Sequence, residues 1–353
     1  MPVTGGMLTG MDGRIHTTFT HNPSTLRLSS HDPNLFNIPR GVDNDVERWV
    51  KECFVAPPGY VFWERDYAAM EPTLVGYFAG SRRYVRAARV GIHALVTSHL
   101  VGTPADFGWD DTRLGEYLRV VKKTHPATYD IAKRIVNGSN YKMTPRKMHY
   151  EYPEHFKSTK DAARLQSLYF DLFPEIREWH RELCLRVDGT KRRRVGDTTE
   201  TLDPWTLGVC FAKNPFGYVH RFYNVLDWTK VDGKWESSDG EDAKRLVADL
   251  PQSTGAGIIK RVMRTLWYEY PWVGETLRLP IYDAMFGECR EEELDQCLTI
   301  SQQVMEAPIP ELPLDPTWGM GDHLTIGSEA KVGKSWASMQ PPTKEPKPLP
   351  LAA

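Results

Sequence analysis

One stretch of this 353-residue chain, Tyr60 to Gly80, constrains its fold more than any other. It opens with four aromatic or β-branched residues, a composition typical of a buried strand, and helix-forming residues resume at Ala68. Asp66 therefore stands where the strand is expected to end. A carboxylate at a strand end is held rigidly and can face a cleft, which suits a hard cation such as Mg²⁺. The alternative is that Asp66 only caps a turn or a helix.

A second carboxylate, Asp283, interrupts an apolar and aromatic run from Leu279 to Phe286. Two Asp residues in such positions could face each other across a sheet. Paired carboxylates that clamp two metal ions about 3.5 to 4 Å apart are the usual arrangement for in-line phosphoryl transfer. The two aspartates therefore favour a nucleotidyl transferase.

The composition is that of a folded globular protein, with 41% hydrophobic and 25% charged residues. No apolar run has the roughly 18 to 20 residues that cross a bilayer, and the N-terminus lacks the basic and apolar segments of a signal peptide. We therefore expect a cytoplasmic protein without membrane contact. Five scattered cysteines without a C-x-x-C pair predict reduced, structural thiols. A net charge of −2 does not by itself indicate nucleic-acid binding, and the basic run at 191–194 is most simply solvated surface.

The segment from Asp12 to Arg40 contains Thr-Leu-Arg-Leu-Ser-Ser at 25–30 and Pro-Asn-Leu-Phe-Asn-Ile-Pro at 33–39. This word order resembles a motif with which family A DNA polymerases grip the primer-template, whereas the simpler interpretation is a polar loop. An arginine can neutralise a phosphate or reach a minor-groove acceptor, and short polar side chains can donate to the backbone of DNA. The DNA-binding residues that the resemblance implies here are Arg27, Ser29, Ser30, Asn34 and Asn37.

The residues from Asp66 to Glu71 read Asp-Tyr-Ala-Ala-Met-Glu and are similar to the family's first catalytic motif, Asp-Tyr-Ser-Gln-Ile-Glu. The resemblance implies that two Mg²⁺ ions are bound by Asp66, the backbone carbonyl of Tyr67 and Asp283. It also implies that Glu71 packs beneath the incoming sugar and excludes a 2′-hydroxyl. Asp283 stands where the family has Val-His-Asp-Glu, but the last residue is Ala284 here, so a carboxylate near the metals is absent.

Residues 130–141 are expected to form the fingers helix that closes on the nucleotide, with Lys133 as the cation for the triphosphate. Its face includes Tyr129 where the family has Arg, and Asn137 where the family has a stacking aromatic ring. Lys133 could instead be an ordinary surface lysine. A lost phosphate contact could be supplied by Arg134 or Lys142. The nucleotide-binding residues implied are Tyr67, Glu71, His93, Tyr129, Arg134, Asn137 and Tyr141, with Asp66, Asp283 and Lys133 as the catalytic set.

Two later segments extend the resemblance to DNA contacts. Residues 214–221 look like a degenerate form of the family's Gly-Arg-Arg-Arg loop and end on Arg221. Residues 250–260 resemble the palm helix whose Gln touches the primer end, which implies that role for Gln252, although the small residues after it also suit simple helix packing. We further expect helices at 162–173, 175–188 and 291–306, an exposed insertion at 228–240 and a terminal strand at 329–336.

These features predict an α+β, right-hand polymerase fold, with an antiparallel palm sheet, flanking helices and a mostly helical fingers subdomain. The expected division is palm at 1–81, fingers with insertions at 82–244, palm at 245–340 and a disordered tail at 341–353. The implied function is template-directed addition of deoxynucleotides to a primer 3′-hydroxyl by a two-metal-ion mechanism. The alternative, motivated by Tyr129, Asn137 and Ala284, is a catalytically weakened subunit that binds primer-template or single-stranded DNA.

The expected partners are primer-template DNA and deoxynucleoside triphosphates. Only eleven residues precede Asp12, where the family has a helical thumb. We therefore expect a separate polypeptide that carries the thumb and an exonuclease. The shortened form also suggests a phage protein that acts in a host cytoplasm.

Overall fold

The computed structural model describes residues 10–21, 25–38, 45–187, 192–195, 198–201 and 210–343, and of these it describes the backbone alone at 45–48, 192–195 and 198–201. The chain divides into two compact units. One, the sheet unit, comprises Met1–Ala68 with Gly255–Ala353, and the other, the helical unit, comprises Ala69–Thr254. The palm and fingers boundaries expected from the sequence stay predictions.

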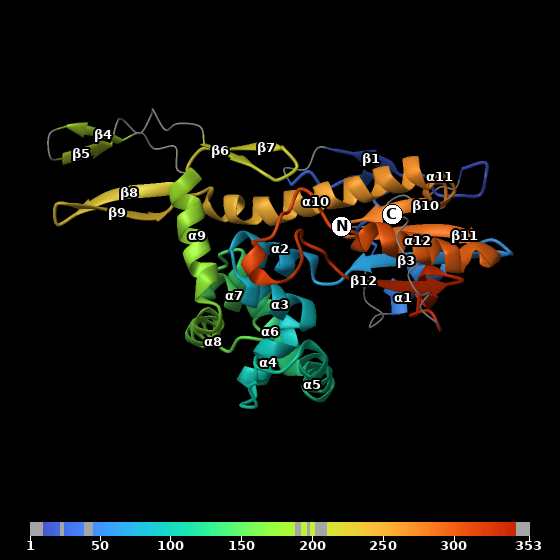
Figure 1. The fold of residues 1–353 in the computed structure, drawn as a ribbon, viewed down its shortest axis with the longest axis horizontal. Helices are drawn as coiled ribbons and strands as arrows, with labels where there is room; N and C mark the ends of the chain where they lie inside the picture. Colours follow the sequence, from blue (N-terminus) through green and yellow to red (C-terminus); the bar gives the residue numbers. More distant parts are fainter. Residues whose placement is uncertain are drawn as a thin grey trace. The chain divides into compact units, whose positions relative to one another are not determined.

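The sheet unit is built on a four-stranded antiparallel sheet in the order β10-β11-β3-β12 (Figure 1). Its strands are β3 (Tyr60–Tyr67), β10 (Leu277–Ile281), β11 (Ala284–Arg290) and β12 (Ser328–Gly333). Helices α10 (Ala243–Glu269), α11 (Pro271–Gly274) and α12 (Leu294–Glu306) follow or separate these strands, and α10 begins in the helical unit. The predicted α+β class with an antiparallel sheet is confirmed.

One face of the sheet packs on α12 through alternate residues of β3. Trp63 is fully buried, and the guanidinium of Arg65 donates from Nε to Ser301 Oγ at 3.2 Å and from Nη2 to the Leu298 carbonyl at 3.1 Å. Tyr67 donates its hydroxyl to the Met305 carbonyl at 2.7 Å. Because side chains alternate along a strand, the remaining residues of β3 point to the opposite face.

That opposite face carries a second apolar cluster, in which Phe62 and Phe286 contact each other with ring centroids 5.1 Å apart. The loop Leu35–Ile38 and Trp336 pack on it. The smaller elements of this unit are β1 (Thr18–Thr20), β2 (Ser29–His31), α1 (Asp45–Glu52), η2 (Glu291–Glu293), η3 (Pro316–Trp318) and η4 (Trp336–Ser338). The loop and η4 therefore cover part of the sheet face on which Asp66 lies.

The helical unit contains α2 (Met70–Phe78), α3 (Arg82–Val90), α4 (Ile92–Leu100), α5 (Asp111–Thr124), α6 (Pro126–Asn140), α7 (Pro145–Glu151), α8 (Thr159–Leu172) and α9 (Pro174–Val187). Three polar side chains inside its core tie α3, α6 and α8 together. Asn140 Oδ1 accepts hydrogen bonds from the hydroxyls of Tyr84 at 2.7 Å and Tyr169 at 2.5 Å, and all three residues are buried. Satisfied buried groups of this kind fix the relative positions of the helices.

Three β-hairpins follow the helices, formed by β4 (Arg192–Val195) with β5 (Thr198–Thr201), β6 (Cys210–Lys213) with β7 (Val219–Phe222), and β8 (Leu226–Val231) with β9 (Lys234–Asp239). The segment at 214–221 is thus a turn and a strand rather than one long loop. Asn214 closes the turn by accepting the Tyr218 amide at 3.0 Å, and Gly217 has φ +89°. The insertion expected at 228–240 is the mostly exposed hairpin β8–β9.

The helices expected at 162–173 and 175–188 are α8 and α9, with boundaries shifted by one to three residues. The side chains of the basic run 191–194 and the tail residues 344–353 lie outside the described residues. The five cysteines are free, and all but Cys53 are buried. Among the described helices, none is long and apolar enough to cross a membrane.

We predict that Gly287→Ala destabilises the sheet unit. A Cβ at this position would lie 2.4 to 2.5 Å from atoms of the buried Trp63 indole, and overpacking of a core typically costs about 1–3 kcal/mol. Urea unfolding followed by Trp fluorescence would measure the loss. Gly327→Ala is the matched control, because its Cβ would meet no atom within 4 Å. Equal midpoints for the two variants would contradict the packing described here.

Candidate active site

Asp66 and Asp283 are brought to the same end of neighbouring strands by the pairing of β3 with β11. Asp66 is the penultimate residue of β3, and its cross-strand partner is Ala284, the residue after Asp283. The Tyr67 amide donates to the Asp283 carbonyl at 3.3 Å. Asp283 occupies the two-residue turn between β10 and β11, in which Tyr282 adopts a left-handed φ of +58°. This register places the backbone of Asp283 beside the end of β3, and the facing of the two carboxylates stays a prediction.

The side chain of Tyr282 links this turn to the N-terminal loop. Its ring lies 6.0 Å from the Arg27 guanidinium carbon and 5.9 Å from the Phe36 ring, between centroids. Its hydroxyl donates to Asn37 Oδ1 at 3.4 Å. Two of the predicted DNA-binding residues, Arg27 and Asn37, therefore lie beside the turn that carries Asp283.

Other residues of the N-terminal block hold its own backbone in place. Ser30 is buried, and its hydroxyl accepts the Leu35 amide at 2.9 Å. Asn34 Oδ1 accepts the amides of Phe36 at 3.0 Å and Asn37 at 3.2 Å. Ser29 Oγ lies 2.5 Å from Thr20 Oγ across the β1–β2 hairpin. These contacts give Ser29, Ser30 and Asn34 a structural role, and their contact with DNA stays a prediction.

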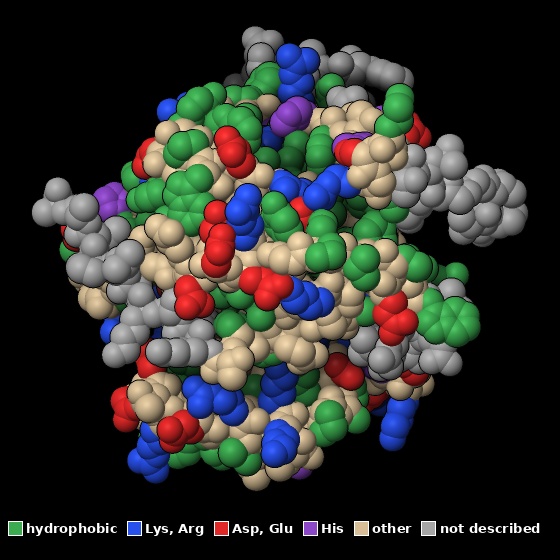
Figure 2. Space-filling view, turned by 90° about the vertical axis from the view of Figure 1, so that its right-hand side faces the viewer, with side chains coloured by type: hydrophobic (Ala, Val, Ile, Leu, Met, Phe, Trp, Pro, Cys, Tyr) green, Lys and Arg blue, Asp and Glu red, His purple; other side chains and the backbone are tan. Residues whose placement is uncertain are grey.

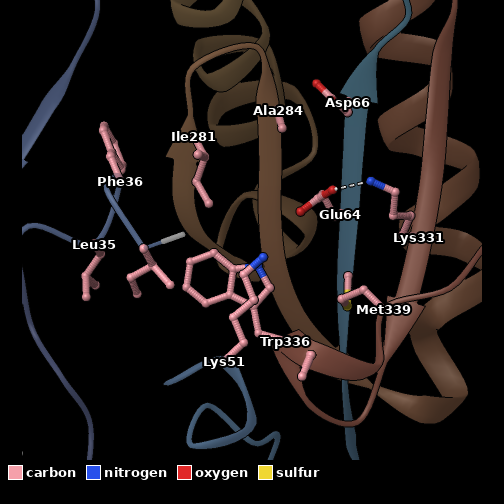
Figure 3. Close-up of a pocket in the computed structure, with 12 residues that line it drawn as sticks. Leu35, Phe36, Lys51, Glu64, Asp66, Ile281, Ala284, Lys331, Trp336 and Met339 are labelled. Atoms are coloured by element: carbon pink, nitrogen blue, oxygen red, sulfur yellow. Dashed lines mark hydrogen bonds and ion pairs between the residues drawn. The ribbon is translucent and has the colours of Figure 1, made fainter. Parts of the chain in front are cut away.

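A cavity of about 250 Å³ lies on the Asp66 face of the sheet. Figure 3 shows Asp66 and Glu64 projecting from β3 to the same side, with Ala284 on the neighbouring strand and Lys331 reaching toward Glu64. Lys331 Nζ is 3.1 Å from Glu64 Oε1. The remaining wall is largely apolar and is formed by Leu35, Phe36, Ile38, Ile281, Trp336, Ala337 and Met339, with Lys51.

The donor atoms at this strand end suit magnesium. Within the described part of the chain, no three His, Cys, Asp or Glu residues are grouped as a metal cage. Magnesium does not require one, because it usually binds through one or two carboxylates and completes its octahedron with water and phosphate oxygens. Two carboxylates and a backbone carbonyl match that habit. The side chain of Tyr67 faces α12, where burial raises the pKa of its hydroxyl well above the usual value, so the hydroxyl points away from the sheet face that carries Asp66.

In the helical unit, a hydrogen bond joins Glu71 and Tyr141. Glu71 lies in the first turn of α2, and Tyr141 is the residue that ends α6. The Tyr141 hydroxyl donates to Glu71 Oε2 at 2.9 Å, in a partly buried position. A carboxylate held in this way has a fixed direction, which is a requirement for recognition by shape.

The predicted residues of α6 share one face with His93 of α4. Tyr129, Lys133 and Asn137 follow at four-residue spacing, and Lys133 and Asn137 are exposed. His93 Nε2 lies 3.4 Å from Asn137 Oδ1, and its ring meets that of Tyr129 edge-on with centroids 5.9 Å apart. Burial lowers the pKa of His93 to about 4, with further contributions from the nearby lysines 133 and 122. His93 is therefore neutral at physiological pH.

Arg134 and Lys142, the two residues predicted to replace a missing phosphate contact, both interact with other side chains. Arg134 stacks its guanidinium 4.7 Å from the Tyr152 ring centroid, and Lys142 pairs with Asp239 at 2.5 Å. On β7, Arg221 is exposed with its guanidinium 5.9 Å from the Phe211 ring, and Gln252 is half-buried on α10. Neither Glu64 nor Lys331 belongs to a motif, and the only sequence signal for Glu64 is its position two residues before Asp66 on a strand.

Charged side chains of both signs are interspersed on the face drawn in Figure 2. This mixture agrees with the net charge of −2. The face in Figure 2 therefore presents a mixture of charges rather than a broad basic field.

The family model described as DNA polymerase family A matches residues 5–195. Similar curated proteins include a thermostable DNA polymerase I of Thermus thermophilus, at 24% identity over 315 residues, or 88% of this chain and 32% of that protein. Another is DNA polymerase I of Mycobacterium tuberculosis, at 29% identity over 88% of this chain and 30% of that protein. The chain thus spans about a third of the length of these relatives.

A similar solved structure is described as the POL domain of Pol1 from M. smegmatis in complex with DNA primer-template and dNTP. It has 21% sequence identity and a TM-score of 0.64, and the match covers 93% of this chain and 49% of that chain. At this identity the likeness shows the fold.

We predict that the helical unit loses stability in mild acid. His180 is buried and its Nε2 donates to the Asn140 carbonyl at 2.9 Å, and burial lowers its pKa to about 4, as it does for His93. At these two histidines the unfolded chain therefore binds more protons than the folded chain between about pH 6.5 and 4. For His180 the unfolding free energy falls by up to about 1.4 kcal/mol per pH unit as the pH drops.

Urea unfolding at pH 7.5, 6 and 5 would measure this loss. His180→Gln keeps a donor for Asn140 but cannot titrate, so its stability should depend less on pH. If the wild type and His180→Gln lose the same free energy between pH 7.5 and 5, His180 is not the titrating group.

Proposed function

Because the chain belongs to DNA polymerase family A, we propose that it adds deoxynucleotides to a primer 3′-hydroxyl under the direction of a template. The observation that carries the proposal is the β3–β11 register, which brings Asp66 and Asp283 to one strand end. The solved relative described as holding primer-template and dNTP supports these partners. The separate thumb polypeptide and the phage origin stay predictions.

Asp66, Asp283 and the Tyr67 carbonyl hold the divalent cations in this proposal. When bound, two magnesium ions would favour ionisation of the primer hydroxyl and neutralise the charge that develops on the triphosphate. Asp66, Asp283 and the Tyr67 carbonyl fix the position of the cations relative to the primer hydroxyl and the triphosphate in this proposal. Their rigidity comes from the paired backbone of β3 and β11 rather than from a flexible loop.

Lys133 binds the triphosphate. Its exposed ammonium projects from the α6 face that also carries Asn137 and Tyr129. The neutral imidazole of His93 holds Asn137 and Tyr129 in place by the hydrogen-bond and ring contacts described above. Arg134 and Lys142 already have partners, so Lys133 is the cation of this helix best placed to reach a phosphate.

Glu71 selects the sugar, with Tyr141 as the residue that positions it. The 2.9 Å hydrogen bond fixes the carboxylate of Glu71, and a fixed group beneath a deoxyribose leaves no room for a 2′-hydroxyl. Arg27 and Asn37, which lie beside the Asp283 turn, contact the primer-template. Arg221 and Gln252 are further DNA-contacting residues in this proposal. Arginine suits this task because its contact with phosphate or a groove acceptor does not require one particular sequence.

A DNA-binding subunit without catalysis is the second candidate. The observation that favours it is Asn137, which offers no ring on which a base could stack, a contact worth about 1–3 kcal/mol per base. Primer extension in Mg²⁺ separates the two candidates. DNA binding without any extension would support the subunit.

We predict that Asp66→Asn and Asp283→Asn each abolish nucleotide addition while primer-template affinity changes by no more than a few-fold. Metal ligation acts on the transition state, whereas phosphate contacts supply the affinity for DNA. Single-turnover extension and fluorescence anisotropy would measure the two effects. Asp322→Asn, at an exposed position of the same unit, is the matched control and should behave like the wild type. Near-normal extension by either aspartate variant would remove the catalytic assignment.

We predict that Glu71→Ala raises the ratio of ribonucleotide to deoxyribonucleotide incorporation by roughly tenfold or more, the scale of discrimination that one close steric contact supplies. Tyr141→Phe should raise the ratio less, because the carboxylate remains but loses its donor. Competitive incorporation of both sugars into one primer would measure it. Glu178→Ala, an exposed glutamate on α9, is the control. An unchanged ratio in Glu71→Ala would mean that other residues select the sugar.

A further inference from the structure

A second carboxylate shares the cavity with Asp66. Glu64 precedes Asp66 by two residues on β3, so both side chains leave the sheet on the same face. Both line the cavity of about 250 Å³, and Figure 3 shows their oxygens on the same side of the strand. Only 16% of the Glu64 side chain is exposed. Its carboxylate therefore faces the cavity more than open solvent.

Lys331 fixes the direction of the Glu64 carboxylate. The two residues are directly opposite each other on β3 and β12, and their charged groups are 3.1 Å apart. The lysine side chain is 42% exposed, and an exposed ion pair of this kind contributes little to stability. Lys331 therefore acts mainly by holding the Glu64 carboxylate in one position and by neutralising its charge.

Among the described residues that line this cavity, Glu64 is the acidic neighbour of Asp66. Ala284, opposite Asp66 on β11, ends at its Cβ and adds no charge. Glu329, opposite Asp66 on β12, is exposed and does not line the cavity. A water molecule or cation that enters the cavity beside Asp66 therefore meets the Glu64 carboxylate next.

We propose that Glu64 is a positioning residue that orients water on the cavity side of the cation held by Asp66 and Asp283, and that Lys331 sets how much negative charge that cation senses. The inference rests on the proposed function. Groups that hydrogen-bond to the ligands or waters of a metal commonly change its affinity by about 10- to 100-fold. Glu64 and Lys331 thus act on the affinity for the cation, with opposite signs.

The test measures Mn²⁺ binding to the full chain by electron paramagnetic resonance, without DNA or nucleotide. Glu64→Gln leaves the Lys331 charge uncompensated and replaces a charged acceptor for water by a neutral, weaker one, so Mn²⁺ should bind about tenfold more weakly. Lys331→Met leaves the Glu64 charge uncompensated, so Mn²⁺ should bind more tightly. The double variant, in which both charges are gone, should lie between the single variants. The Mg²⁺ concentration for half-maximal extension should shift in the same order.

Shifts in the same direction, or no shift, in the two single variants would overturn the inference, because a pair that only joins β3 to β12 has no reason to act with opposite signs. Thermal melting of each variant excludes misfolding as the cause. Glu329→Gln removes the same charge from the same sheet face outside the cavity, and an equal shift in that variant would also overturn the inference. Asp66→Asn is the separate check on the proposed function. If it binds Mn²⁺ like the wild type, the metal assignment itself is wrong, whereas loss of binding there with unchanged Glu64→Gln affinity refutes only the role of Glu64.

Discussion

Backbone pairing between β3 and β11 is the constraint from which the candidate site follows. Asp66 and Asp283 lie far apart in the sequence, and no side chain needs to join them, because the ladder that pairs Asp66 with Ala284 also sets the position of the adjacent turn. A slip of one residue would turn Asp66 toward α12 and put a neighbour into the cavity. The register is therefore the feature that packing on both sheet faces must protect.

Trp63 and Arg65 protect that register from the α12 face. Trp63 lies over Gly287, the only residue type that leaves room for its indole, and the Arg65 guanidinium reaches Ser301 and Ser328. A buried guanidinium is stable only where its donors are satisfied. If β3 slipped, Arg65 would lose these acceptors, so a charged side chain inside the unit makes the register specific as well as stable.

The fold of β3 could be predicted from the sequence only in part. Aromatic and β-branched residues mark the strand, and Asp66 stands near its end as expected, but Glu64, Arg65 and Asp66 are three charged residues in a row. Hydrophobic alternation cannot tell which of them is buried, since that depends on acceptors supplied by α12. The contact between Glu64 and Lys331 cannot be predicted from the sequence either. It depends on the pairing of β3 with β12, and no local sequence pattern connects these two segments.

Local spacing was more informative in the helical unit. Four-residue periodicity predicts that Tyr129, Lys133 and Asn137 share a face of α6, and they do. The same periodicity does not predict the contact of Arg134, because its stacking on Tyr152 depends on the path of the chain after α7. Spacing along one helix predicts which side chains point in the same direction. It does not predict which contacts a side chain makes, because these depend on the elements that pack against the helix.

Burial of His93 then decides what the α6 face can do. Its imidazole is neutral at pH 7 because burial lowers its pKa to about 4, so it holds Asn137 and Tyr129 without adding a charge. Positive charge on this face consequently comes from lysine, and Lys133 is the exposed one among the predicted residues. A protonated histidine here would give the face a charge that varies near pH 6.5. With the neutral imidazole, His93 contributes no pH-dependent charge to this face across the physiological range.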